Sequence, residues 1–361
     1  MHSRTERPRV HYPEIDALKG VAMLCVLLIH AAPLAGSLLH DAIINRAVPV
    51  LLVLFGASSQ LWWDRYAGES FVRTALELWR SRYARLMPPV WVAVGLWWLA
   101  IPTLGIAPVP AWHWLPLHLL GHLPQIGTGW FITLIVQLVL LFPLLVLVQR
   151  GLGAALSCGA GIAVLVACHL HAFTVLGWMR GVLLDVPLEG LFVFYPFWIF
   201  APASFFSLLA GMALARRGMR VSRAGLLACA LSLLAGHYVQ RTQLEDPLAR
   251  NALAALLDLP LAILGLAALR SAAWPAPCVR ALEWVGRASW GMYLGQLLVH
   301  NALVEAWPRL LGDSSAAHWL YFLCLLAGGL AWIEAERRVR RWLSARATAA
   351  SAPLPLEARL L

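Results

Sequence analysis

Ten apolar runs, each close to the length of a membrane-spanning helix, dominate this sequence. About 20 mostly apolar residues cross the hydrocarbon core of a bilayer as a helix. The chain is 61% hydrophobic and 13% charged, with a mean hydropathy of +0.73, which excludes a water-soluble globule and a disordered chain. The sequence predicts an all-α polytopic membrane protein of about ten transmembrane helices, at residues 17–39, 47–63, 84–101, 129–149, 152–176, 193–215, 223–240, 251–269, 289–311 and 316–336.

The basic residues predict an orientation for these helices, because Lys and Arg gather on the cytoplasmic side of membrane proteins. With the N-terminus inside, most of the 28 basic residues fall in cytoplasmic segments. We therefore expect cytoplasmic tails at residues 1–14 and 339–361. The net charge of +10 then reflects membrane topology, and we expect no nucleic-acid partner. The basic residues left on the outer side are Arg46, Arg180, Arg241, Arg250 and Arg309.

The chain is expected to form a single membrane domain over residues 1–361, since it has no internal repeat and no polar stretch long enough for a soluble domain. An amphipathic, Arg-rich segment at residues 69–83 is expected to lie on the membrane surface. A cleaved signal peptide ending near residues 31–35 is an alternative for the N-terminus, which polar residues in the first helix disfavour. The six cysteines contain no C-x-x-C pair, so we expect neither disulfides nor a metal site. Lys19 is the only lysine, and this preference for arginine suggests a GC-rich bacterium and its cytoplasmic (inner) membrane.

The first expected helix carries Asp16, Lys19 and His30. Lys19 and His30 are eleven residues apart, which at 100° per residue places them on one face, about 16 Å apart along the axis. Lys19 would lie at the cytoplasmic rim and His30 near the middle of the membrane. An ionisable residue at that depth faces a cavity or a partner, so His30 is either a site residue or a hydrogen-bonded histidine packed between helices.

Arg82 and Arg85 follow in the Arg-rich segment, just before Pro88 and Pro89. Three residues apart on a helix, they point the same way. Two guanidinium groups near Lys19 would suit phosphate, because Arg offers it a planar fork of donors. The alternative is positive-inside topology with contact to lipid headgroups.

Polar residues form one stripe along the ninth expected helix, and the fourth expected helix carries a tryptophan and an amide of interest. In lipid, such a stripe must face protein or a wet cavity, so it either lines a site or joins helices by hydrogen bonds. The fourth helix holds a buried amide, which is expected to join helices in the same way. The stripe consists of Ser289, Tyr293, Gln296 and His300, and the fourth helix contributes Trp130 and Gln137.

Asp258 is the one acidic residue well inside an apolar run, two positions before Pro260. It marks either a functional site or a structural network around the carbonyl group that Pro260 leaves unpaired. The outer loop at residues 102–128 is uncharged and rich in proline, histidine and tryptophan. We expect an aromatic interface or lid there rather than a metal site, since Pro116 interrupts any helix between the first two histidines. The loop residues concerned are Trp112, His113, Trp114, His118 and His122.

Four segments, in this order, resemble the membrane-bound acyltransferase 3 family, whose members move acyl groups, often acetyl, onto glycans and other acceptors. Residues 15–20 followed by His30 resemble its opening motif, an Arg or Lys, ten residues and then His. Arg82-x-x-Arg85 resembles the second motif, residues 130–143 the fourth-helix signature, and residues 286–294 the late motif. The ordered set, which spans about residues 10–300, is specific where no single motif is.

The resemblance implies a membrane acyltransferase that takes an acyl group, most often acetyl, from cytoplasmic acyl-CoA to a hydroxyl group of a glycan or glycolipid. Acyl-CoA would be a co-substrate, and no tightly bound cofactor is expected. Lys19, Arg82 and Arg85 would hold the CoA phosphates, and His30 would be the general base. Tyr293 and Ser289 would donate hydrogen bonds to the carbonyl oxygen as it becomes negative. Substrate contacts are expected from Trp130, Gln137, Gln296 and His300.

The chain departs from the family pattern at two positions. The fourth-helix signature often contains Glu, where this chain offers Gln137, and the family usually has His where Gln296 stands. The runner-up function is a transporter or flippase for a glycan or lipid precursor, which would not depend on acyl-CoA. A third reading is a membrane sensor or scaffold in which His30 is only packed. P-loop, G-x-G-x-x-G, H-E-x-x-H and G-x-S-x-G motifs are absent from the sequence.

Overall fold

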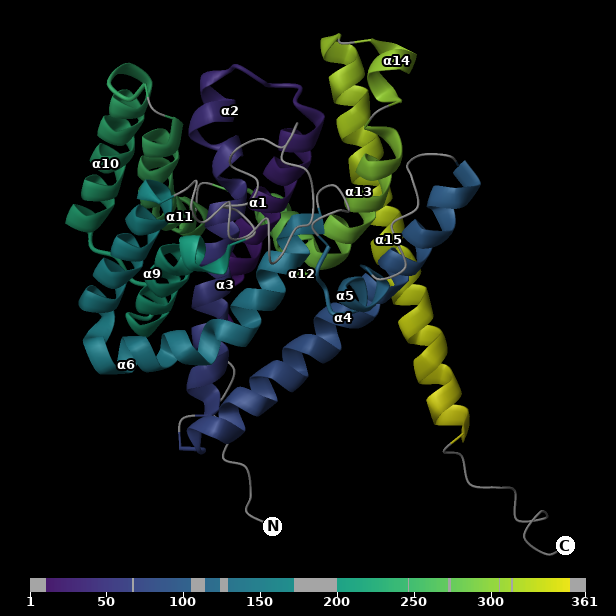
Figure 1. Ribbon diagram of the computed structural model, residues 1–361, viewed down its shortest axis with the longest axis horizontal. Helices are drawn as coiled ribbons and strands as arrows, with labels where there is room; N and C mark the ends of the chain where they lie inside the picture. The colour runs from purple at the N-terminus through teal and green to yellow at the C-terminus, as the bar shows by residue number, and fades with distance from the viewer. Residues whose placement is uncertain are drawn as a thin grey trace, which may run out of the picture.

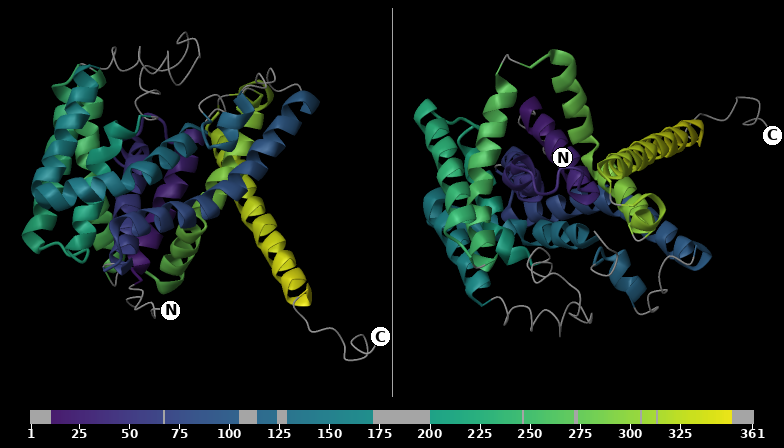
Figure 2. Two further views of the ribbon diagram at one scale, coloured as in Figure 1. Left: turned by 60° about the horizontal axis from the view of Figure 1, so that its bottom comes forward. Right: turned by 90° about the horizontal axis from the view of Figure 1, so that it is seen from above.

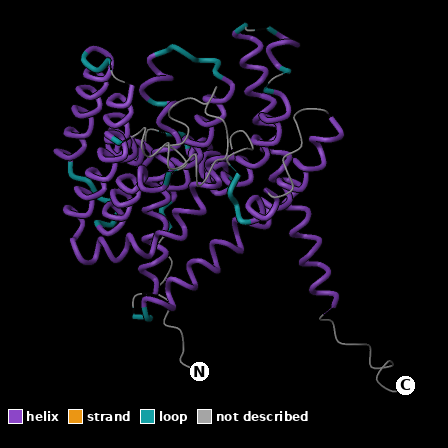
Figure 3. Tube along the Cα trace, viewed as in Figure 1, coloured by secondary structure: helices purple, strands orange, loops and turns teal. Residues whose placement is uncertain are grey.

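The computed structural model is helical, as the composition predicts. It describes residues 11–66, 68–104, 114–123, 129–171, 200–245, 247–271, 274–304, 306–312 and 314–350. Within these ranges there is no β-strand (Figure 3). The α-helices are α1 (Pro13–Ala31), α2 (Leu38–Ala42), α3 (Ala47–Trp63), α4 (Phe71–Leu104), α5 (Leu115–Leu119), α6 (Trp130–Leu170), α9 (Phe205–Arg216), α10 (Arg223–Thr242), α11 (Pro247–Arg270), α12 (Ala276–Arg287), α13 (Ser289–Leu303), α14 (Trp307–Leu311) and α15 (Ser315–Ala350), with 3₁₀ turns η1 (Ile44–Arg46), η2 (Asp64–Tyr66) and η6 (Ala201–Ser204).

Four helical segments among the described residues are long and apolar enough to cross a membrane. These segments identify an integral membrane protein. The ten spans and the two cytoplasmic termini stay predictions. The four segments are Leu38–Tyr66, Trp130–Leu170, Leu253–Arg270 and Ser315–Arg346.

The Arg-rich segment and the third expected span form one helix, α4, where the sequence suggested two elements. The helix continues through Pro88 and Pro89, although a proline inside a helix leaves a backbone carbonyl without its usual donor. Neighbouring helices supply donors for such carbonyls in membrane proteins. Trp290 Nε1 of α13 donates to the carbonyl oxygen of Leu86 at 3.2 Å, just after the carbonyls that the two prolines affect.

The fourth and fifth expected spans meet at Gly153, whose backbone (φ 76°, ψ 170°) is not helical and redirects α6. A left-handed φ of this kind favours glycine. The ninth expected span is shorter than the sequence suggested, because α13 ends at Leu303 and the separate helix α14 follows. The amphipathic helix α12 is an element that the apolar runs did not indicate.

α1 is the central helix, with contacts to α3, α11, α12, α13 and α15. In Figure 1, α10 and α11 lie side by side on the left and α13 and α15 pack on the right. α4 crosses the lower half diagonally, and α15 extends beyond the other helices. Figure 2 places α1 between α11 and α12 when the molecule is viewed from above.

Glycines set the closest helix contacts. A Cβ on Gly286 of α12 would collide with the backbone carbonyl of Asp16, and one on Gly20 of α1 would collide with that of Leu282. Gly295 of α13 approaches the backbone of Gly328 in α15 in the same way. Small residues at helix interfaces let backbones approach in membrane proteins. These glycines therefore allow α1 to pack closely on α12 and α13 to pack closely on α15.

The close approach of α1 and α12 predicts that Gly286→Ala destabilises the protein. The added methyl group meets backbone rather than a flexible side chain, so the expected loss of unfolding free energy is about 1–3 kcal/mol. Thermal or denaturant unfolding in one detergent measures this loss. Gly95→Ala on α4 is the control, because nothing lies within 4 Å of its added Cβ, and equal stability of the two variants would contradict the packing described.

Candidate functional site

His30 ends a chain of aromatic contacts that joins α1 to α13 and α15. Its ring lies 4.6 Å from the ring of His300, centroid to centroid, at an interplanar angle of 51°. The hydroxyl group of Tyr321 lies 2.9 Å from Nδ1 of His300, and the Tyr321 ring stacks on Trp307 at 4.8 Å. The structure thus brings two of the sequence-predicted site residues together, His30 and His300, and fixes the second of them through Tyr321.

A cavity of about 550 Å³ lies on the other side of His30. Its wall is built from α1, α2, η1, α3, α6, η6, α9, α10 and α11, and it contains Trp130 and Asp258 from the sequence-predicted set. This volume lies within the 300–1,000 Å³ range of small-molecule sites. His30 therefore lines a cavity large enough for a substrate.

The Lys19 end of α1 gathers positive charge. The Lys19 ammonium lies 3.5 Å from Asp16, whose other oxygen lies 3.1 Å from His11. Both Arg82 and Arg85 act on Lys19 electrostatically. The three predicted cations are thus close enough to interact, and only one carboxylate, Asp16, is paired with Lys19 among the described residues.

Arg82 is held against α3 while Arg85 is exposed. The Arg82 guanidinium lies 5.9 Å from the ring centre of Phe55, and its Nη2 donates to Ser59 Oγ at 3.4 Å. Its Nε is buried and has no hydrogen-bond partner among the described residues. A buried donor without a partner is unfavourable, so this guanidinium can still bind an anion such as phosphate.

The polar stripe of α13 is buried at Tyr293 and Gln296 and partly buried at Ser289 and His300. Tyr293 stacks on Trp290 at 5.9 Å and meets the edge of Phe131 at 5.3 Å. Both amide atoms of Gln296 are buried without a hydrogen-bond partner among the described residues. At 1.5 Å per residue, Ser289 and Tyr293 lie about 16 and about 10 Å along the axis from His300. They therefore lie nearer the Lys19 end than His30 does.

Gln137 joins helices, as expected, since its Oε1 accepts a hydrogen bond from the backbone N–H of Ala201 at 3.3 Å. In the outer loop, His118 accepts a hydrogen bond from Trp98 Nε1 at 3.3 Å. Trp114 stacks over His118 and His122 at 6.5 and 6.4 Å. His113 and Trp112 lie outside the described residues. The loop residues that are described form an aromatic cluster.

Sequence reasoning missed several residues of the site. Tyr321 supports His300 from α15, and Arg46, His169 and His237 line the cavity. The sequence did carry one signal for this cavity, the basic residues expected on the outer side. Three of those five residues lie in the cavity wall: Arg46, Arg241 and Arg250.

A family model described as an acyltransferase domain, Acyl_transf_3, matches residues 12–333 of the chain. The match contains every sequence-predicted site residue. Neither the curated proteins nor the solved structures contain a match.

The pairing of Tyr321 with His300 predicts that Tyr321→Phe destabilises the protein. Loss of the hydroxyl group leaves His300 Nδ1 without this partner in a partly buried place, and the expected loss of unfolding free energy is about 1–3 kcal/mol. Unfolding in detergent measures the loss. Tyr238→Phe is the matched control, because the Tyr238 side chain is exposed on α10. A Tyr321→Phe protein as stable as this control would contradict the assigned contact.

Proposed function

The chain belongs to the acyltransferase 3 family, and we propose that it moves an acyl group, acetyl first, from cytoplasmic acyl-CoA to a hydroxyl group of a glycan or glycolipid. The observation that carries this proposal is the arrangement of α1. One end of the helix holds Lys19 beside Arg82 and Arg85, and His30 lines a substrate-sized cavity further along. The proposed setting is the bacterial cytoplasmic membrane, with the Lys19 end of α1 inside.

The donor would bind with its phosphates at Lys19, Arg82 and Arg85. Arg binds phosphate through paired donors, and Lys adds a compact charge. The pantetheine arm would then run along α1 and α13, which contact each other. Gln296 lies about 6 Å along α13 from His300, toward the Lys19 end. Its unpartnered amide supports a hydrogen bond to the amide groups of the arm.

His30 would act as general base on the acceptor hydroxyl. It takes the hydroxyl proton while the oxygen attacks the thioester carbon, and the C–S bond then breaks as an ester forms. The proton passes from His30 to the departing CoA thiolate, so the histidine is regenerated. Neutral imidazole suits this exchange at neutral pH. His300, held by Tyr321 at 2.9 Å, would orient the His30 ring.

Tyr293 and Ser289 stay the proposed donors to the carbonyl oxygen of the reacting thioester. Their spacing along α13 makes them unequal, since Tyr293 is about 6 Å closer to the level of His30 than Ser289 is. Tyr293 is therefore the stronger candidate for this role. Ser289, at the start of α13, is better placed to contact the donor near Lys19.

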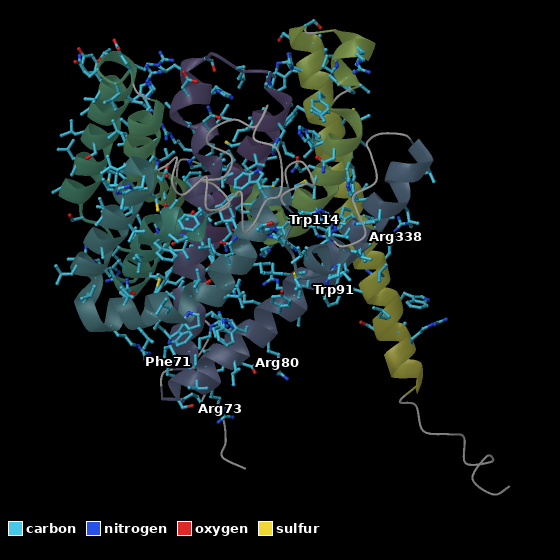
Figure 4. The ribbon with its side chains drawn as sticks, viewed as in Figure 1. Phe71, Arg73, Arg80, Trp91, Trp114 and Arg338 are labelled. Atoms are coloured by element: carbon cyan, nitrogen blue, oxygen red, sulfur yellow. The ribbon has the colours of Figure 1, made fainter. Side chains whose placement is uncertain are left out.

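The phosphate assignment predicts that Arg82→Ala/Arg85→Ala weakens acetyl-CoA binding by at least about 100-fold, since each of the two lost hydrogen bonds to a charged group contributes about 1.5–3 kcal/mol. Equilibrium binding to the purified protein measures it. The control is Arg73→Ala/Arg80→Ala, which removes the same charge from the same helix. Arg73 and Arg80 pair with Glu69 and Glu77 and project from the lower edge of α4 (Figure 4). Equal weakening by both pairs would contradict a specific phosphate site.

The base assignment predicts that His30→Ala binds acetyl-CoA with little change but transfers the acyl group about 10²–10⁴-fold more slowly, the usual contribution of a general base. Release of free CoA thiol and acylation of a membrane extract report the transfer. His171→Ala is the control, because it makes the same change at an exposed histidine outside the cavity wall. Full transfer by His30→Ala would refute the mechanism. A wild-type protein with no saturable acyl-CoA binding would instead favour the transporter.

A further inference from the structure

The cavity beside His30 contains a buried carboxylate that the chemistry of His30 does not use. Asp258 of α11 is fully buried and lines the cavity. Neither of its two oxygens has a hydrogen-bond partner among the described residues. Burial of a carboxylate without hydrogen bonds is strongly unfavourable, and a ligand that donates to it would remove that penalty. The position of Asp258 therefore points to a ligand in the cavity.

The wall contains three arginines and two aspartates, and each arginine already has a partner without a ligand. Arg46 is 8% exposed and interacts electrostatically with Asp258, and its Nη2 donates to Gln240 Oε1 at 2.8 Å. Arg241 pairs with Asp41 at 2.5 Å. Arg250 directs its Nε to the backbone oxygen of Leu244. An anionic ligand would be repelled by Asp258 and a cationic one by Arg46, so hydrogen-bond donors without charge fit best.

The wall offers further hydrogen-bonding groups and an aromatic surface. Nε2 of His237 is buried without a partner among the described residues, and Ser204 and Ser207 contribute hydroxyl groups. Trp130 lies in the same wall. A sugar ring has hydroxyl groups around its edge and an apolar face of C–H groups, so it matches a wall with one large aromatic ring and several separated polar atoms.

We infer that this cavity binds a neutral pyranose unit of the acceptor, with two adjacent hydroxyl groups of the sugar donating to the two oxygens of Asp258. A carboxylate accepts two such hydrogen bonds at once, and Arg46 is close enough to act on it electrostatically. The inference rests on the proposed function, because it names the acceptor of that reaction. Asp258 is then a substrate-binding residue that leaves a different hydroxyl of the ring free to meet His30.

The test uses the full chain in nanodiscs made of phospholipid only. The probes are octyl β-glucoside, octyl β-galactoside and octyl α-mannoside, each below its micelle concentration. Octyl β-glucuronide is the anionic comparison and octyl 2-amino-2-deoxy-β-glucoside the cationic one. We expect saturable binding of at least one neutral glycoside, with both charged analogues at least 10-fold weaker. Asp258→Asn should weaken the neutral probe at least 10-fold and leave acetyl-CoA affinity unchanged.

Two further proteins separate recognition from folding. Asp258→Asn leaves the buried charge of Arg46 unbalanced, whereas Arg46→Gln/Asp258→Asn removes both charges and should also lose glycoside binding. Glu245→Gln is the matched control, since it makes the same change at an exposed site between α10 and α11. Unchanged glycoside binding in the double variant overturns the inference. So does a charged analogue that binds best, or the absence of saturable binding by every neutral probe.

Acetyl-CoA distinguishes this inference from the proposed function. Glycoside binding that depends on Asp258, in a protein that binds no acyl-CoA, supports the sugar site and refutes the acyltransferase. Acyl-CoA binding and thioester cleavage that depend on His30, with glycoside binding indifferent to Asp258, support the enzyme and overturn the sugar site.

Discussion

The structure depends on one constraint, that α1 carries polar side chains through an apolar surrounding and must find partners for them among other helices. Lys19 pairs with Asp16 and lies near the two arginines of α4. The His30 ring packs against His300 and lines the cavity. Contacts with α3, α11, α12, α13 and α15 provide this environment. Because Gly20 and Gly286 have no side chain, α12 packs directly against the backbone of the Lys19 half of α1. The packing around α1 is thus the means by which the site is built.

The parts of the site that lie on one helix could be predicted from the sequence. The shared face of Lys19 and His30 and the stripe from Ser289 to His300 follow from helical periodicity alone. The membrane class follows from apolar runs. Helix boundaries were harder to predict from the sequence where two local signals competed. Pro88 and Pro89 suggest an interruption in α4, but the helix continues to Leu104, and Trp290 of α13 donates to the carbonyl of Leu86 just after the carbonyls that the prolines affect.

The partners of those residues could not be predicted, because each pairing joins helices distant in the chain. Tyr321 reaches His300 only after α14 has turned the chain back, and nothing in the pattern of α15 marks that tyrosine. Asp258 drew attention as an acidic residue in an apolar run, but Arg46, which acts on it electrostatically, lies in the distant turn η1. Arg46, Arg241 and Arg250 are exceptions to the charge pattern expected from the sequence, and all three converge on one cavity wall.

The rigidity of α1 separates the two leading functions. Lys19 and His30 are fixed about 16 Å apart by backbone hydrogen bonds within one helix, so this distance cannot change without unwinding α1. A transporter must expose one site to each side of the membrane in turn, usually through interrupted helices at the site. α1 is continuous from Pro13 to Ala31, with a cationic end, a histidine and a cavity arranged along it. A fixed spacing suits a donor whose phosphates bind at one point while its acyl group reacts at another. The donor and the acceptor can then meet at His30 from opposite ends, and the protein need not alternate between two states.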